Sequence, residues 1–225
     1  MAEANSNTSH SPFKLILIPA LITLVVTLLR LTGELMHWSP KWFNPAPGGG
    51  GAIVGIVWLV PVFGVYFALR LTRSGQGPAR AARAIGYALL GSAIFVGGFL
   101  LFQDYIRNLS GLVLMWTLAT LGALIQRVAW RPLFGVLLAY GYLARIPVAV
   151  IMLLATRLRW ESHYSALAMP ETELHWVAQF FLFGFVPQLV WWVGFTVVAG
   201  TLFGSIAAAI ALRRKAVSQT APHSQ

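Results

Sequence analysis

The chain has no cysteine and few acidic residues: its 225 residues include 6 Asp or Glu against 16 Lys or Arg. The absence of cysteine excludes disulfides, thiolate metal ligands and thiol nucleophiles. Charged residues make up only 10% of the chain and hydrophobic residues 58%, which exceeds the roughly 45–50% apolar share of soluble domains. With a mean hydropathy of +0.74, the chain is expected to be an integral membrane protein.

The net charge of +10 does not indicate nucleic-acid binding. A phosphate-binding face must be continuous, whereas the basic residues here are scattered over short segments between hydrophobic runs. The lipid bilayer is therefore the expected partner. We predict a single transmembrane helical domain over residues 13–212, preceded by a disordered cytoplasmic tail over 1–12 and followed by a basic cytoplasmic tail over 213–225.

Hydrophobic runs predict transmembrane helices at about 13–32, 52–71, 85–102, 109–126 and 133–156. The next apolar run, Leu174 to Leu212, would be roughly 58 Å long as one helix, nearly twice a hydrocarbon core of about 30 Å. Pro187 is expected to divide it into an interfacial helix over 172–185 and a sixth span over 186–212. The predicted fold is all-α: a polytopic membrane bundle of six transmembrane helices, with an interfacial helix before the last span.

The distribution of basic residues predicts which side of the membrane each end of these helices faces. With the N-terminus inside, ten basic residues lie on the cytoplasmic side and five outside, so the positive-inside rule favours cytoplasmic termini. We expect a multi-pass protein of a bacterial inner membrane. The cytoplasmic set is Lys14, Arg70, Arg73, Arg80, Arg83, Arg127, Arg131, Arg213, Arg214 and Lys215, and the outer set is Arg30, Lys41, Arg107, Arg157 and Arg159. The outer face also receives Glu34, Asp104, Glu161, Glu171, Glu173, His37, His163 and His175.

Arg145 is the strongest single indication of function, because it lies some 11 residues from either end of the fifth predicted span. A cation at that depth costs at least about 2.5–3.5 kcal/mol and usually faces a cavity or a partner. One hypothesis is that Arg145 binds an anionic small molecule or lipid headgroup, with Glu34 and Asp104 as further ligand-binding candidates. The alternative is structural: Arg145 bonds to helix carbonyls freed by Pro147, or pairs with Asp104 or Glu34.

Other polar residues give weaker indications. Arg30 and Glu34 are four residues apart and predict a surface ion pair on one helix face. Glu161 and His163 are weak catalytic candidates as general bases, since no nucleophile motif accompanies them. His163, Glu171 and His175 have the ligand types of a zinc site but no ligand motif, so no metal or cofactor is predicted. Glu171 and Glu173 after Pro170 also suit a helix N-terminus.

Gly200 and Gly204 are spaced for close helix packing, either within the bundle or in a homo- or hetero-oligomer. Three functions remain open. The first is a binding or transport component for an anionic ligand, which Arg145 favours. The second is a membrane-embedded enzyme that acts on lipid or envelope substrates at the outer face. The third is a structural or accessory subunit of a membrane complex, for which no ionisable residue is essential.

Overall fold

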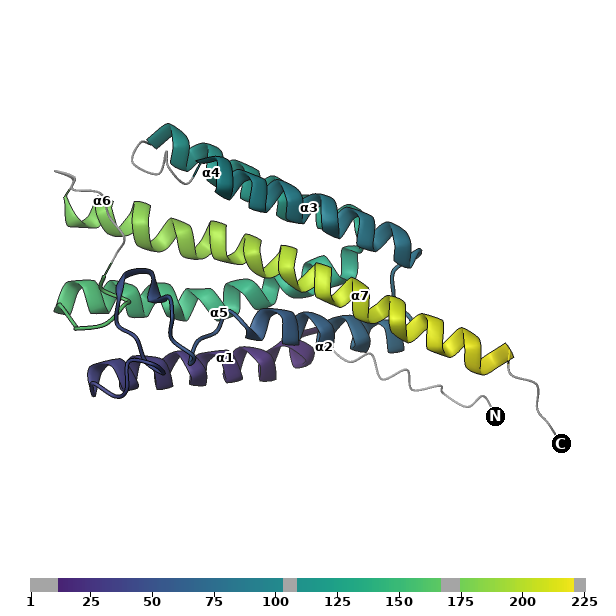
Figure 1. Cartoon of the computed structure of the whole chain (residues 1–225), viewed down its shortest axis with the longest axis horizontal. Coiled ribbons are helices and arrows are strands. Elements are labelled where there is room, and N and C mark those ends of the chain that lie inside the picture. Colours follow the sequence, from purple (N-terminus) through teal and green to yellow (C-terminus); the bar gives the residue numbers. More distant parts are fainter. Residues whose placement is uncertain (1–11, 103–108, 167–174, 221–225) are drawn as a thin grey trace, which may run out of the picture.

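The computed structural model describes residues 12–102, 109–166 and 175–220, and all regular structure in those ranges is helical (Figure 1). In chain order the elements are α1 Pro12–Leu35, η1 Pro47–Gly49, α2 Leu59–Arg73, α3 Ala81–Phe102, α4 Leu109–Ala129, α5 Arg131–Leu158, α6 Trp176–Phe180, η3 Phe181–Phe185, η4 Pro187–Trp192 and α7 Val193–Thr220. Five stretches of helix in these ranges are long and apolar enough to cross a membrane. The prediction of an all-helical chain with several apolar membrane helices is confirmed.

Helices α1, α3, α4 and α5 begin and end within four residues of the predicted positions. Their mean hydropathies of 1.6 to 2.3 explain the agreement, because long apolar runs can form helices only if every backbone group is bonded within the segment. Large hydrophobic side chains such as Ile18, Leu100 and Ile146 remain exposed on the outside of the bundle, which is the surface expected to face lipid.

The second predicted span is wrong in its first half. Residues 52–58 form turns, and helix α2 begins only at Leu59, so its 15 residues reach about 22 Å, short of a hydrocarbon core of about 30 Å. The backbone N–H groups of Ile53 and Val54 donate to the carbonyls of Lys41 and Trp42, at 3.2 and 3.1 Å. The chain between α1 and α2 therefore folds back on itself as a loop over one end of the bundle (Figure 1), and this pairing replaces the first turns of the expected helix.

The predicted break at Pro187 is also wrong. One continuous helix of 40 residues, Trp176–Lys215, replaces the interfacial helix and sixth span. The chain avoids the break by widening into the π-helical segments η3 and η4, because a π turn can accommodate the missing N–H of a proline without ending the helix. Residues 172–174 of the expected interfacial helix lie outside the described ranges.

Small residues bring α7 against the centre of the bundle. A side chain at Gly64 of α2 would meet the backbone of Gly200 at 2.6 Å, and one at Gly204 would meet the Gly64 carbonyl at 2.8 Å. Gly200 also lies against Leu137 of α5. The two glycines singled out in the sequence thus pack within the chain against α2 and α5.

Two clusters of buried apolar residues lie at different levels of the bundle. The first gathers the start of α1 (Ile16), the end of α2 (Leu71), the start of α5 (Leu133) and the end of α7 (Ala208). The second joins the end of α1, the end of α5, Tyr164 and Phe180. Helices α1 and α5 both run toward the end of the bundle where the loop after α1 folds back, and the second cluster lies at that end (Figure 1).

Candidate functional site

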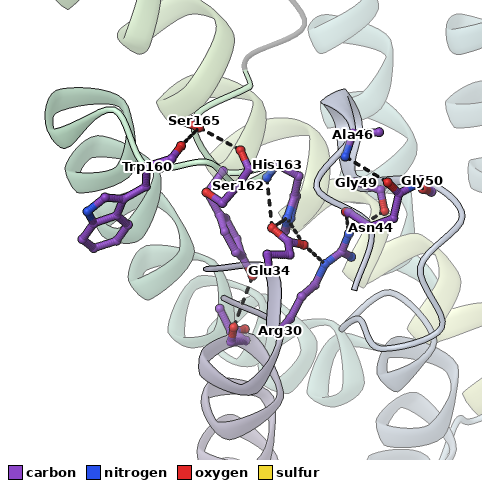
Figure 2. A network of polar contacts seen from close by, with 12 residues as sticks. Arg30, Glu34, Asn44, Ala46, Gly49, Gly50, Trp160, Ser162, His163 and Ser165 are labelled. Carbon is purple, nitrogen blue, oxygen red and sulfur yellow. Dashed lines mark hydrogen bonds and ion pairs between the residues drawn. The ribbon is translucent and has the colours of Figure 1, made fainter. Parts of the chain in front are cut away.

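Three charged or titratable side chains meet below the loop that follows α1 (Figure 2). The Nε of Arg30 donates to Oε1 of Glu34 at 2.8 Å. The backbone N–H of His163 donates to Oε2 at 3.0 Å, and its ring Nδ1 lies 2.6 and 2.7 Å from the two carboxylate oxygens. The Glu34 side chain is fully buried and that of Arg30 is 10% exposed. The predicted surface pair is therefore a buried cluster with a third member, 129 residues away in sequence.

Arg30 also anchors the loop after α1 to the bundle through hydrogen bonds. Its Nη2 donates to the carbonyl oxygens of Asn44 at 3.2 Å and Gly49 at 2.8 Å. Gly49 has a φ of 66°, a conformation that favours glycine, and a side chain there would meet Cδ2 of His163 at 2.6 Å and Nη2 of Arg30 at 3.0 Å. Gly49 thus packs closely against His163 and Arg30, while Glu34 bonds to His163 through Nδ1.

The segment after α5 presents His163 to this cluster. The Ser165 hydroxyl donates to the carbonyls of Trp160 and Ser162, which closes a tight turn around His163 (Figure 2). Tyr164, which follows His163, is buried. Its ring centre lies 3.8 Å from that of His163 with the two planes tilted by 42°, and its hydroxyl donates to the Thr27 carbonyl at 3.4 Å. Burial raises the pKa of Tyr164, so its hydroxyl stays protonated and acts as a fixed donor.

The surroundings of His163 favour its neutral form. Burial lowers its pKa below the ordinary 6.5, and the Arg30 cation acts in the same direction, although the Glu34 carboxylate opposes both. An ionised carboxylate can only accept hydrogen bonds, so the proton of the neutral ring is on Nδ1 and Nε2 has a free lone pair. The structure gives Nε2 no hydrogen-bond partner among the described residues.

Arg145 of α5 is buried, with 4% of its surface exposed. Its Nη1 donates to Oε1 of Gln188 at 3.3 Å, and its guanidinium lies 4.6 Å from the centre of the Trp192 ring. Both partners are on η4, the π-helical segment that follows Pro187. No carboxylate of the described residues forms an ion pair with Arg145, so its charge is not neutralised there.

A cavity of about 200 Å³ joins these groups. It is comparable in size to the engineered cavity of about 150 Å³ that binds benzene. Its polar lining comes from Thr27, Arg30, Arg145, His163, Tyr164 and Gln188, and its apolar lining includes Val26, Ile56, Val148, Met152, Phe183 and Trp192. Because Glu34 neutralises Arg30, the cavity has a net positive charge that Arg145 supplies.

A second hollow, on the outside of α4, has no comparable chemistry. Val113, Trp116, Thr117, Thr120 and Leu121 line it, and none of them is charged. The hydroxyls of Thr117 and Thr120 donate to carbonyls of their own helix, so they offer no free donor. The cavity at Arg145 is accordingly the candidate functional site.

The structure brings together only some of the residues singled out in the sequence. Arg145 and His163 line the cavity, and Glu34 lies behind His163. Glu161 instead faces outward, 83% exposed and 3.8 Å from the likewise exposed His37, and the His175 side chain accepts from the backbone of Val177 at the start of α6. Asp104 and Glu171 lie outside the described residues. In the ranges that are described, no three His, Asp or Glu side chains converge on a point.

Neither Gln188 nor Trp192 is predicted from the sequence to be a site residue. Gln188 directly follows Pro187 within the last apolar run. An amide beside a helix-distorting residue in a membrane segment is a detectable signal, since polar side chains there usually bond across helices. Trp192 has no such signal, because tryptophan is equally expected at a lipid interface.

Fold and site together define a class: an α-helical bundle with several apolar membrane helices and a small, positively charged cavity between α1, α5 and η4. Comparison with protein-family models, curated proteins and solved structures finds no match. The functional assignment therefore depends on the chemistry of the cavity.

Proposed function

We propose that the protein binds a small organic anion in the cavity at Arg145 and acts as a binding or transport component for it. The observation that supports this is a buried guanidinium that lines a cavity with no acid of the described residues to pair with it. An uncompensated buried cation is costly. A carboxylate or phosphate that enters the cavity would remove that cost and accept two parallel N–H donors of Arg145.

The experiment is a thermal-shift panel on purified protein in nanodiscs. Benzoate, inorganic phosphate and short-chain phosphatidylglycerol represent a free carboxylate, a free phosphate and a lipid headgroup, and benzamide is the neutral counterpart of benzoate. An anion at about ten times its Kd stabilises the folded state by about 1.4 kcal/mol, a rise of a few degrees in Tm. We expect this rise with at least one anion and not with benzamide.

Three variants test whether Arg145 is responsible. Arg145→Ala should abolish the anion-dependent rise, and Arg145→Lys should retain only part of it, because lysine keeps the charge but not the planar fork. Arg157→Ala is the matched control: it removes one positive charge from the same helix, at an exposed position outside the cavity. If no anion raises the Tm of wild type more than that of Arg145→Ala, the proposal is wrong.

We further propose that the chain crosses a bacterial inner membrane six times, with both termini cytoplasmic. The ten-to-five excess of predicted inner basic residues supports this orientation, with the loop and short helix α2 together forming the second crossing. The chain has no cysteine, so single cysteines can be labelled without background. We expect an impermeant maleimide applied to intact cells to label Ser39→Cys, in the exposed loop after α1, and not Ser74→Cys, exposed after α2. The opposite pattern would reverse the orientation.

A second candidate is a membrane-embedded enzyme, and one observation favours it. Glu34 fixes the tautomer of His163 as a carboxylate does for a general base. Ser165, however, donates to two backbone carbonyls and not to His163. Because no nucleophile of the described residues is hydrogen-bonded to His163, binding is the better-supported function.

A further inference from the structure

The cavity has two chemically different ends. At one end the guanidinium of Arg145 is held by Gln188 and Trp192. At the other end is the imidazole of His163, whose Nδ1 is bonded to Glu34 and whose opposite edge, Cδ2 and Nε2, faces Gly49, which also lines the cavity. A ligand in this space therefore meets both a fixed cation and a basic nitrogen.

We infer that the site takes its anion together with a proton, and that Nε2 of His163 receives the proton. This deepens the proposed function and rests on it. The ligand class is a small monoanion with an apolar body, such as an aromatic carboxylate, because one charge is left to neutralise at Arg145 and the remaining walls are largely apolar.

The charges around His163 explain the coupling. On α1, the Arg30 cation and the Glu34 anion cancel each other at 2.8 Å. Arg145 of α5 faces the same cavity. The nearby pair of His37 and Glu161, in the segments after α1 and α5, is exposed to solvent. In the empty cavity a proton on His163 would add a second uncompensated cation beside Arg145, so the ring stays neutral.

An anion in the cavity reverses this balance. Its charge compensates Arg145, and a proton on Nε2 can then donate to an oxygen of the anion, while Nδ1 continues to donate to Glu34. Glu34 and the turn at Ser165 hold the ring in place for this. By linkage, a ligand that favours the protonated ring must itself bind more tightly as the proton concentration rises.

The test measures benzoate binding to the full chain in nanodiscs by calorimetry between about pH 6 and about pH 8, a range that brackets the ordinary histidine pKa. Benzoate stays ionised throughout this range. Uptake of one proton makes the affinity rise up to about tenfold for each unit by which the pH falls. Titrations in two buffers of different ionisation enthalpy count the protons directly and need no variant.

Two substitutions localise the proton. His163→Gln retains a hydrogen-bond donor to Glu34 but cannot titrate, so its benzoate affinity should be independent of pH and its proton uptake zero. Glu161→Gln, two residues away and exposed, should retain the wild-type dependence. Benzoate binding to wild type without proton uptake overturns the coupling and leaves the anion site intact. An absence of benzoate binding at every pH overturns the inferred ligand class, and only an absence of binding by phosphate and phosphatidylglycerol as well counts against the proposed function itself.

Discussion

Replacement of Glu34 by alanine is expected to lower the free energy of unfolding by about 3–5 kcal/mol, the usual cost of removing one partner of a buried ion pair. The carboxylate accepts from Nε of Arg30 and from both N–H groups of His163, and its side chain is fully buried. Without it a buried cation remains and three donors lose their acceptor. Denaturant titration in mixed micelles measures the loss.

Glu161→Ala is the matched control for this measurement. Glu161 is also an acid near His163 in sequence, but it lies 3.8 Å from His37 with 83% of its side chain exposed. A surface pair of this kind contributes little, typically under about 1 kcal/mol. We expect the unfolding free energy of Glu161→Ala to match that of wild type.

A double variant tests whether the stability lost in Glu34→Ala comes from the unpaired charge of Arg30. Arg30→Met with Glu34→Met removes both charges and fills a similar volume, and apolar replacements of buried ion pairs are often neutral or stabilising. The double variant should therefore recover at least half of the stability that Glu34→Ala loses, with the remaining loss due to His163. A double variant as unstable as the single one would mean that the charge pair is not the cause.

The helices of this protein and several residues of the site could be predicted from local patterns, whereas the way those residues come together could not. Apolar runs specify α1, α3, α4 and α5 because the bilayer leaves their backbone no other way to satisfy its hydrogen bonds. Arg30 and Glu34 were expected as a pair because their spacing of four residues is a local property. The third member, His163, is 129 residues from Glu34, and no local period relates the two.

The two errors in the predicted fold have different physical origins. The hydrophobicity of residues 52–58 predicts a helix, but the backbone N–H groups of Ile53 and Val54 donate to the carbonyls of Lys41 and Trp42 instead. At Pro187 a break was predicted from length and proline, but π-helical turns absorb the distortion. The first error therefore comes from hydrogen bonds to residues more than ten positions away in the sequence, and the second from a local change of helix type.

The π-helical segment has a direct consequence for the cavity. Gln188 and Trp192 lie on η4 and both contact Arg145, so the distortion that keeps the helix continuous also presents a polar and an aromatic side chain to α5. π-helical turns are frequent at functional sites for this reason.

The second large effect is expected at Arg145, where a substitution should abolish anion binding without lowering stability. Replacement by methionine should abolish the anion-dependent rise in Tm and leave the unfolding free energy unchanged or higher by up to about 2 kcal/mol, as is common when buried charge gives way to apolar groups of similar size. The burial of an arginine costs at least about 2.5–3.5 kcal/mol. Its contacts here are one hydrogen bond of 3.3 Å and one ring, which offset at most about that cost.

Gln188→Leu distinguishes this interpretation from a structural role for Arg145. If the arginine were a structural tie, Arg145→Met and Gln188→Leu would break the same bond and destabilise the protein to a similar degree. If the arginine is kept for a ligand, Gln188→Leu should lower stability by about 1–3 kcal/mol, because it leaves the guanidinium unsatisfied, and benzoate should restore part of that loss by occupying the vacated donors. A loss of more than about 1 kcal/mol in Arg145→Met, with no recovery of Gln188→Leu by benzoate, would assign Arg145 to the scaffold.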